Sequence, residues 1–104
     1  MSVDVSIRAK REIDIYEENI TYNLADMYYK AIDQENGLER LDGVTCKHAL
    51  PIINNAIKDM VENKEEYEKL NPSNGWGSYD GLLETFKEMR NVCEDNPDGV
   101  FSID

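Results

Sequence analysis

Two helical patterns of the chain are separated by the sequence Asn71-Pro72-Ser73-Asn74-Gly75-Trp76-Gly77-Ser78-Tyr79-Asp80-Gly81-Leu82-Leu83. This stretch contains the only tryptophan, three of the six glycines and one of the three prolines. Such a composition predicts a turn with positive φ at glycine. The indole of Trp76 then either plugs the edge of the core or remains available to a ligand.

The residues after this loop form the clearest helical pattern of the chain. Ser78 is placed to accept the first free N–H groups as N-cap, and Asp80 suits the positive end of the helix. The apolar positions repeat at helical spacing in one stripe: Tyr79, Leu82, Leu83, Phe86, Met89, Val92 and Cys93. Residues 96–99 stop the helix, and residues 100–104 then alternate as a terminal strand, with Phe101 and Ile103 on one face.

Before the loop, a first helical pattern follows an N-cap at Thr21 or Asn23. Its apolar stripe is Leu24, Met27, Tyr28, Ala31 and Ile32. We expect it to end at Asn36-Gly37, where Gly37 suits the left-handed position after a helix. A connector over residues 38–43, anchored by Leu38 and Leu41, leads to the next pattern.

Thr45 is the expected N-cap of that second pattern, whose apolar face is Leu50, Ile53, Ile57, Met60 and Val61. Because the ring of Pro51 removes a backbone donor and clashes one turn back, we expect a short first turn over residues 45–50 and a main helix from near Pro51. Residues 62–69 continue as a charged helical end or a separate turn, with Tyr67 and Leu70 facing inward.

The N-terminal residues alternate between apolar and polar side chains, as half-buried strands do. Val3, Val5 and Ile7 form one run, and Ile13 and Ile15 form a second. Ala9-Lys10-Arg11 between them lacks turn-forming residues, so the runs make either a loose hairpin or one long strand, of which we prefer the hairpin. The C-terminal strand should pair with them, because a lone strand cannot satisfy its backbone. The sequence thus predicts an α+β fold, with about three helices packed on a small antiparallel sheet.

A chain of 104 residues is expected to form a single domain, residues 1–104. No run approaches the roughly 20 apolar residues of a membrane span, and the first residues contain no apolar block of the signal-peptide type. We therefore expect a cytoplasmic protein in which Cys46 and Cys93 are core thiols rather than a disulfide.

Charge is the sharpest global property. Twenty-two acidic residues against 11 basic ones give a formal net charge of −11 and a pI near 4.4. So acidic a surface repels phosphate groups, which disfavours direct binding to nucleic acid or to an anionic membrane. It serves either solubility or attraction to a basic partner protein, including mimicry of nucleic acid in that partner's groove. The sequence leaves homo-oligomerisation open.

The residue types that catalysis needs are sparse. His48 is the only histidine, and Cys46-x-His48 has no two further ligands at metal spacing, so no metal site is expected. Gly75, Gly77 and Gly81 do not make a phosphate loop, because the Gly-Lys-Ser/Thr ending and a preceding strand are missing. Without a credible base, nucleophile or metal set, we expect no enzymatic activity, no catalytic residues and no cofactor.

Two sets of residues are candidates for binding. Carboxylates on the helical patterns could face a basic protein: Glu62, Glu65, Glu66, Glu68, Glu84 and Glu88, with Glu94 and Asp95 beyond them. Short polar side chains and aromatics near helix N-termini could instead hold a small anionic ligand such as a nucleotide: Asn19, Thr21, Asn23, Asn74, Trp76 and Tyr79. The competing interpretations are a solvated helix face for the first set, and helix caps and turns for the second.

Several segments together resemble small phage and prophage proteins without an assigned activity. They are Asn19-Ile20-Thr21-Tyr22-Asn23, Pro51 within an apolar helix, Asn71-Pro72-Ser73-Asn74-Gly75-Trp76-Gly77-Ser78-Tyr79 and Asn96-Pro97-Asp98, so the likeness runs from about Asn19 to Ile103. The resemblance implies an accessory role in phage–host biology and carries over no catalytic residues. We therefore expect a non-enzymatic acidic protein that inhibits a basic host protein, with a nucleotide-binding or nucleotide-sequestering protein as the alternative.

Overall fold

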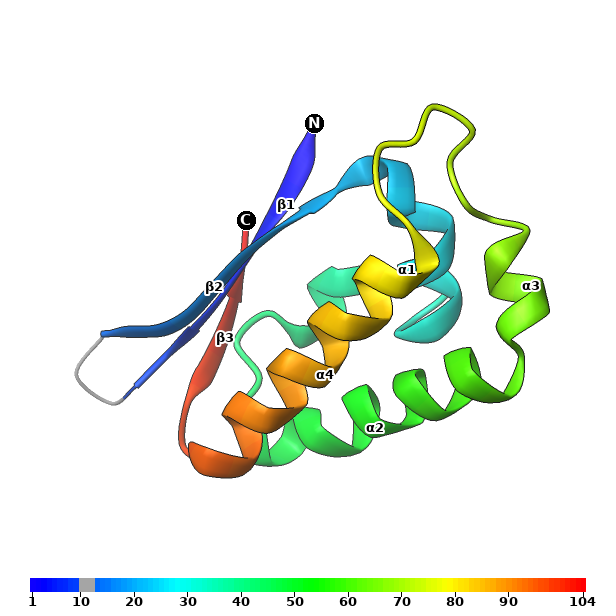
Figure 1. Ribbon diagram of the computed structural model, residues 1–104. Coiled ribbons are helices and arrows are strands. Elements are labelled where there is room, and N and C mark those ends of the chain that lie inside the picture. Colours follow the sequence, from blue (N-terminus) through cyan, green and yellow to red (C-terminus); the bar gives the residue numbers. More distant parts are fainter. Residues whose placement is uncertain (10–12) are drawn as a thin grey trace.

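The computed structural model describes residues 1–9 and 13–104 and has a three-stranded antiparallel sheet with helices on one of its faces (Figure 1). The strands are β1 (Ser2–Arg8), β2 (Asp14–Thr21) and β3 (Val100–Ile103), in the order β2-β1-β3. The predicted α+β fold, the pairing of the C-terminal strand and the hairpin between the first two strands are confirmed. The expected connection at Lys10-Arg11 lies outside the described residues.

Among the described residues, four helices and two 3-10 helices make up the second layer. They are η1 (Tyr22–Leu24), α1 (Ala25–Ala31), η2 (Gly37–Leu41), α2 (Cys46–Glu62), α3 (Lys64–Glu68) and α4 (Tyr79–Asp95). In Figure 1, α2 and α4 run side by side in opposite directions, and α3 continues from the end of α2. None of the helices in the described ranges has the length and apolar character that a bilayer crossing demands.

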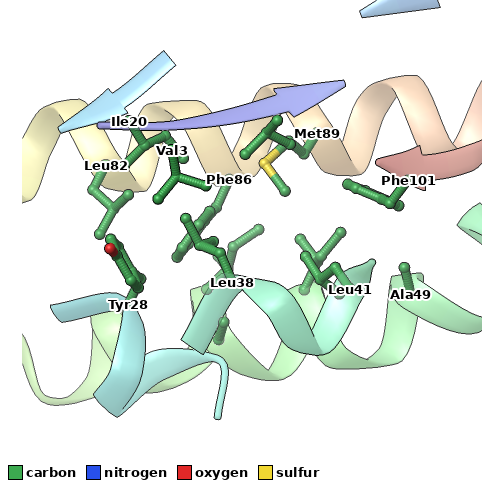
Figure 2. Packing of buried hydrophobic residues seen from close by; sticks show 14 of the residues in the cluster. Val3, Ile20, Tyr28, Leu38, Leu41, Ala49, Leu82, Phe86, Met89 and Phe101 are labelled. Carbon is green, nitrogen blue, oxygen red and sulfur yellow. The ribbon is translucent and has the colours of Figure 1, made fainter. Parts of the chain in front are cut away.

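The hydrophobic core lies between the sheet and the helices (Figure 2). Val3, Ile20 and Phe101 come from the three strands and face the apolar stripe of α4. The predicted stripe is buried at Tyr79, Leu82, Phe86, Met89 and Cys93. Leu38 and Leu41 of η2 close the core from the other side, as the sequence predicted for these two anchors.

The second strand is longer than the sequence predicted, and different residues of it face the core. The alternation of Ile13 and Ile15 predicts that both face the core, but Ile13 is 60% exposed and Ile15 is only half-buried. A β-bulge leaves Ile15 without a partner on β1 and changes the face on which the later residues lie. Tyr16 opposes Ile7 and Ile20 opposes Val3, so the even-numbered residues of β2 take the core side.

The first helix ends at Ala31, five residues before the predicted stop at Asn36-Gly37. The carboxylate of Asp33 explains the early end: its Oδ1 accepts hydrogen bonds from the N–H groups of Glu35 (2.8 Å) and Asn36 (2.9 Å). A side chain that captures backbone donors in this way competes with the helix. Gly37 does adopt a left-handed backbone, with φ of +58°, but at the start of η2.

The predicted break at Pro51 is wrong, because α2 runs without interruption from Cys46 to Glu62. Pro51 lies on the exposed side of the helix, where the carbonyl that loses its donor can tilt toward water. Thr45 occupies the N-cap position as expected. Its side chain makes no capping bond, however, and its Oγ1 lies 3.2 Å from Nδ1 of His48.

Candidate functional site

The loop between α3 and α4 holds Trp76 in solvent. Gly75 and Gly77 have the predicted positive φ, +76° and +97°, and Oδ1 of Asn74 accepts a hydrogen bond from the Trp76 N–H (2.9 Å). Gly77 lies against η1 so closely that a Cβ atom there would be 2.9 Å from Cγ of Leu24. Trp76 itself is 70% exposed, so the interpretation in which it plugs the edge of the core is wrong.

Four of the six residues predicted to bind a small ligand are joined by hydrogen bonds: Thr21, Asn23, Asn74 and Trp76. Nδ2 of Asn23 donates to Oγ1 of Thr21 (2.9 Å), and Nδ2 of Asn74 donates to Oδ1 of Asn23 (3.3 Å). Oγ1 of Thr21 also accepts the Asn23 N–H at 3.3 Å, which makes Thr21 the N-cap of η1. The chain of bonds attaches the Trp76 loop to the end of β2, which is the turn-closing role that competes with ligand binding.

The structure places Asn19 and Tyr79 apart from that group. Nδ2 of Asn19 donates to Oγ of Ser2 (2.7 Å) and Oδ1 of Asp4 (2.6 Å), both on β1. Tyr79 is buried, and its hydroxyl donates to the carbonyl of Met60 (2.6 Å), while burial raises the pKa of its phenol. Its ring therefore belongs to the core rather than to a stacking surface.

The six predicted protein-binding carboxylates are all exposed, and they lie in two places. Glu62, Glu65, Glu66 and Glu68, here called the α3 carboxylates, occupy the end of α2 and the short helix α3. Glu66 contacts Nζ of Lys30 at 3.7 Å. Glu84 and Glu88 lie one turn apart on α4, where Oε1 of Glu88 accepts a hydrogen bond from the hydroxyl of Tyr16 on β2 (3.2 Å).

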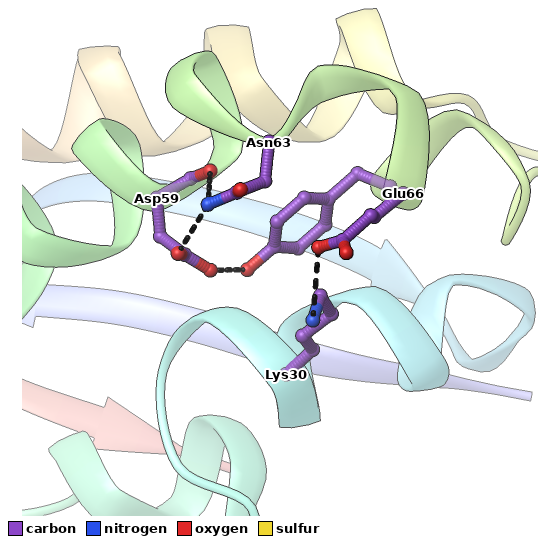
Figure 3. A network of polar contacts seen from close by, with 5 residues as sticks. Lys30, Asp59, Asn63 and Glu66 are labelled. Atoms are coloured by element: carbon purple, nitrogen blue, oxygen red, sulfur yellow. Dashed lines mark hydrogen bonds and ion pairs between the residues drawn. The ribbon is translucent and has the colours of Figure 1, made fainter.

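A polar network that the sequence did not predict joins α3 to α2 (Figure 3). The buried Tyr67 donates its hydroxyl hydrogen to Oδ2 of Asp59, and Nδ2 of Asn63 donates to the other carboxylate oxygen at 2.8 Å. Nζ of Lys30 lies 5.4 Å from the centre of the Tyr67 ring, within cation–π range. Burial, followed by the hydrogen bond to Asp59, raises the pKa of Tyr67. The predicted inward orientation of Tyr67 is confirmed.

The reactive side chains of the chain are placed unfavourably for nucleophilic chemistry. Cys46 and Cys93 are buried free thiols, and burial is the main cause that raises the pKa of both. A raised pKa reduces the thiolate that would act as nucleophile. His48 is exposed beside Thr45. Over residues 1–9 and 13–104, no three His, Cys, Asp or Glu side chains converge on a common point where a metal ion would fit.

Sequence reasoning missed the surface beside β2. A hollow of about 280 Å³ separates its second half from the start of α4, and it is lined by Ile20, Thr21, Leu24, Gly81, Leu82 and Thr85, among others. An open hollow of about 460 Å³ lies on the sheet face opposite the described helices, and it is lined by Asp4, Ser6, Arg8, Asp14, Glu17 and Asn19, among others. The alternation of apolar and polar residues did not predict either hollow, because the bulge at Ile15 changes which residues of β2 lie on each face of the sheet.

No protein-family model, curated protein sequence or solved structure matches the chain.

Proposed function

We propose that this chain is a non-enzymatic binding protein whose acidic surface engages a basic partner protein. The observation that carries the proposal is the net charge of −11, together with the exposure of all six carboxylates that the sequence singles out. Few cations neutralise them: of the α3 carboxylates, only Glu66 has a lysine within 4 Å among the described residues. A surface of one sign raises the association rate with a partner of the opposite sign.

The two carboxylate groups act differently in this proposal. The α3 carboxylates are exposed and supply long-range attraction, which salt screens. Glu84 and Glu88 lie on α4, the helix whose first turns line the hollow beside β2, and they contact the partner directly. The resemblance to small phage and prophage proteins supports an inhibitor of a host defence protein as the specific role.

Binding rather than catalysis is supported by the state of the reactive groups. Both thiols are buried, with a raised pKa, and the polar side chains of Thr21, Asn23 and Asn74 bond to one another. Tyr67 and Tyr79 use their hydroxyls to hold the helices together.

Affinity capture from host lysate tests the proposal. Wild type is compared with a variant in which the four α3 carboxylates are changed to glutamine, which removes charge and preserves side-chain size. We expect wild type to retain a basic protein that the variant retains less well at low salt. A retained partner that is acidic, or equal retention by both chains, contradicts the proposal.

Nucleotide binding is a second candidate, favoured by the exposed indole of Trp76 beside Asn74. Because Trp76 is the only tryptophan, its fluorescence reports directly on this loop. Titration with nucleoside mono- and triphosphates should quench that fluorescence if a base stacks on the indole. Saturable quenching that is lost in Asn74→Ala would favour this candidate over the protein partner.

A further inference from the structure

The two edge strands of the sheet, β3 and β2, differ in whether other backbone segments hydrogen-bond to their outer sides. The segment after η2 covers the outer edge of β3: the N–H of Gly43 donates to the carbonyl of Phe101 (2.8 Å), and the N–H of Phe101 donates to the carbonyl of Val44 (2.9 Å). In the part of the chain that the structure describes, no corresponding backbone bonds reach the outer edge of β2. The sheet therefore has one covered edge and one open edge, and an open edge can pair with another chain.

The pairing of β1 shows which backbone N–H and C=O groups of β2 point away from the sheet. Asp4 exchanges backbone hydrogen bonds with Asp104 (3.3 and 2.9 Å), so even-numbered residues of β1 turn their backbone toward β3. Glu17 and Asn19 oppose even-numbered residues of β1, and their own N–H and C=O groups therefore point outward. Within the described chain, Asn19 N–H alone among these groups has a substitute acceptor, Oε1 of Glu18 at 3.1 Å.

The hollow of about 280 Å³ adjoins this open edge and is lined by residues of β2 and α4. Gly81 contributes no side chain to it, and Leu82 and Ile20 supply apolar lining. A groove between a free strand edge and a helix suits an extended peptide, which adds as a further strand and places alternate side chains in the groove. The width of the opening thus depends on the small residue at position 81.

The charge beside the edge selects among possible occupants. Glu17 is exposed on the uncovered face of the sheet, and the hydrogen bond and negative charge of Asp14 raise its pKa. Arg8 lines the same hollow but is already paired with Asp14 at 3.0 Å. Two copies of β2 joined edge to edge would bring together two strands that each have three acidic residues, Asp14, Glu17 and Glu18, and no basic one, so they repel each other. A basic strand is complementary instead.

We propose that the open edge of β2 binds an extended lysine- or arginine-rich segment of a partner protein, which adds antiparallel to β2 in the groove beside α4. The inference rests on the proposed function, which requires a basic partner, and it specifies the surface and the conformation of the bound segment. Alternate residues of the segment direct basic side chains toward Glu17 and small apolar side chains toward Gly81 and Leu82.

The test uses an end-blocked peptide of eight alternating lysine and valine residues, matched to the eight residues of β2. Residues opposite Glu17 and Asn19 share their face and exchange backbone bonds with them, so they are the lysines. N-methylation of the lysine backbone nitrogens should therefore weaken binding roughly tenfold or more, because at least two hydrogen bonds are lost. N-methylation of the valine nitrogens, with the same charge and mass, should change the affinity by less than about threefold.

Two pairs of protein variants provide controls. Gly81→Leu fills the groove and should abolish peptide binding, whereas Asn91→Leu, exposed elsewhere on α4, should not. Glu17→Gln should weaken binding about threefold and Glu35→Gln, exposed between α1 and η2, should leave it unchanged. Equal affinity for both N-methylated peptides would overturn strand addition, whereas the proposed preference for a basic partner would still stand. Failure of every basic peptide to bind would contradict the preference for basic partners as well.

Discussion

The hydroxyl of Tyr67 on α3 donates a hydrogen bond to Oδ2 of Asp59 on α2, and the Tyr67 ring is fully buried beneath Lys30. This bond, the burial of the ring and the contact of Lys30 with Glu66 together hold the short helix α3, which has only five residues and would not persist alone. The bond therefore helps to position Glu65, Glu66 and Glu68, three of the four carboxylates that we propose to attract a basic partner.

Removal of that hydroxyl should destabilise the fold. Tyr67→Phe leaves the ring in place but leaves Oδ2 of Asp59 without its donor, which should cost about 1 to 2 kcal/mol. The matched control is Tyr22→Phe, at a residue that is 46% exposed, where we expect a change within about 0.5 kcal/mol. Urea denaturation measures both variants, and equal midpoints would show that the bond contributes nothing.

Alkaline pH should destabilise the fold by ionising its buried and half-buried tyrosines. Burial raises the pKa of Tyr67, Tyr16 and Tyr79, with added contributions from Asp59 to Tyr67 and from Glu88 to Tyr16. An unfolded tyrosine ionises near pH 10, so the stabilisation is complete below about pH 10 and is lost as the pH rises above it. Urea midpoints measured between pH 8 and 11 should fall above about pH 10, and they should fall less steeply in Tyr67→Phe. A midpoint that rises through this range would refute the assignment.

The two glycines of the Trp76 loop should respond differently to alanine. Both have positive φ, but a Cβ at Gly75 meets nothing within 4 Å, whereas a Cβ at Gly77 would lie 2.9 Å from Leu24. Gly75→Ala should cost about 1 kcal/mol from backbone strain alone. Gly77→Ala should cost about 2 to 4 kcal/mol, because steric overlap adds to the strain. Thermal denaturation that ranks the two in the reverse order would contradict the packing of this loop on η1.

Trp76→Ala should leave folding nearly intact, with a change within about 1 kcal/mol, because its side chain is in solvent. Phe86→Ala, at a fully buried aromatic of α4, should cost about 3 to 5 kcal/mol and calibrates the comparison. Denaturation is followed by circular dichroism, since the variant lacks the only tryptophan. A loss for Trp76→Ala that approaches the Phe86→Ala value would place the indole in the core after all.

The periodic parts of the sequence predicted the fold well. The stripe from Tyr79 to Cys93, the terminal strand at Phe101 and Ile103, and the cap at Ser78 are confirmed. The spacing of apolar residues could not reveal the bulge at Ile15, which depends on pairing with β1. It also missed the capture of two N–H groups by Asp33, a local effect of a polar side chain that apolar periodicity does not register.

The candidate sites were predicted less completely than the fold, because side-chain type does not fix orientation. Exposure of the glutamates follows from their helical spacing. The hydroxyl of Tyr79 instead reaches inward to Met60, and Asn19 reaches across to β1. The open edge of β2 depends on strand order, which no residue pattern encodes.

The central claim is that negative charge on this surface attracts a basic partner, and association kinetics test it most directly. Stopped-flow or biosensor association with the captured partner is measured at about 50 and 500 mM salt, for wild type and for the variant with glutamine at all four α3 carboxylates. We predict that salt slows wild-type association at least about tenfold, and that the variant associates more slowly than wild type at low salt but equally at high salt, with little change in dissociation. An association rate that is independent of both salt and the four substitutions would contradict the account.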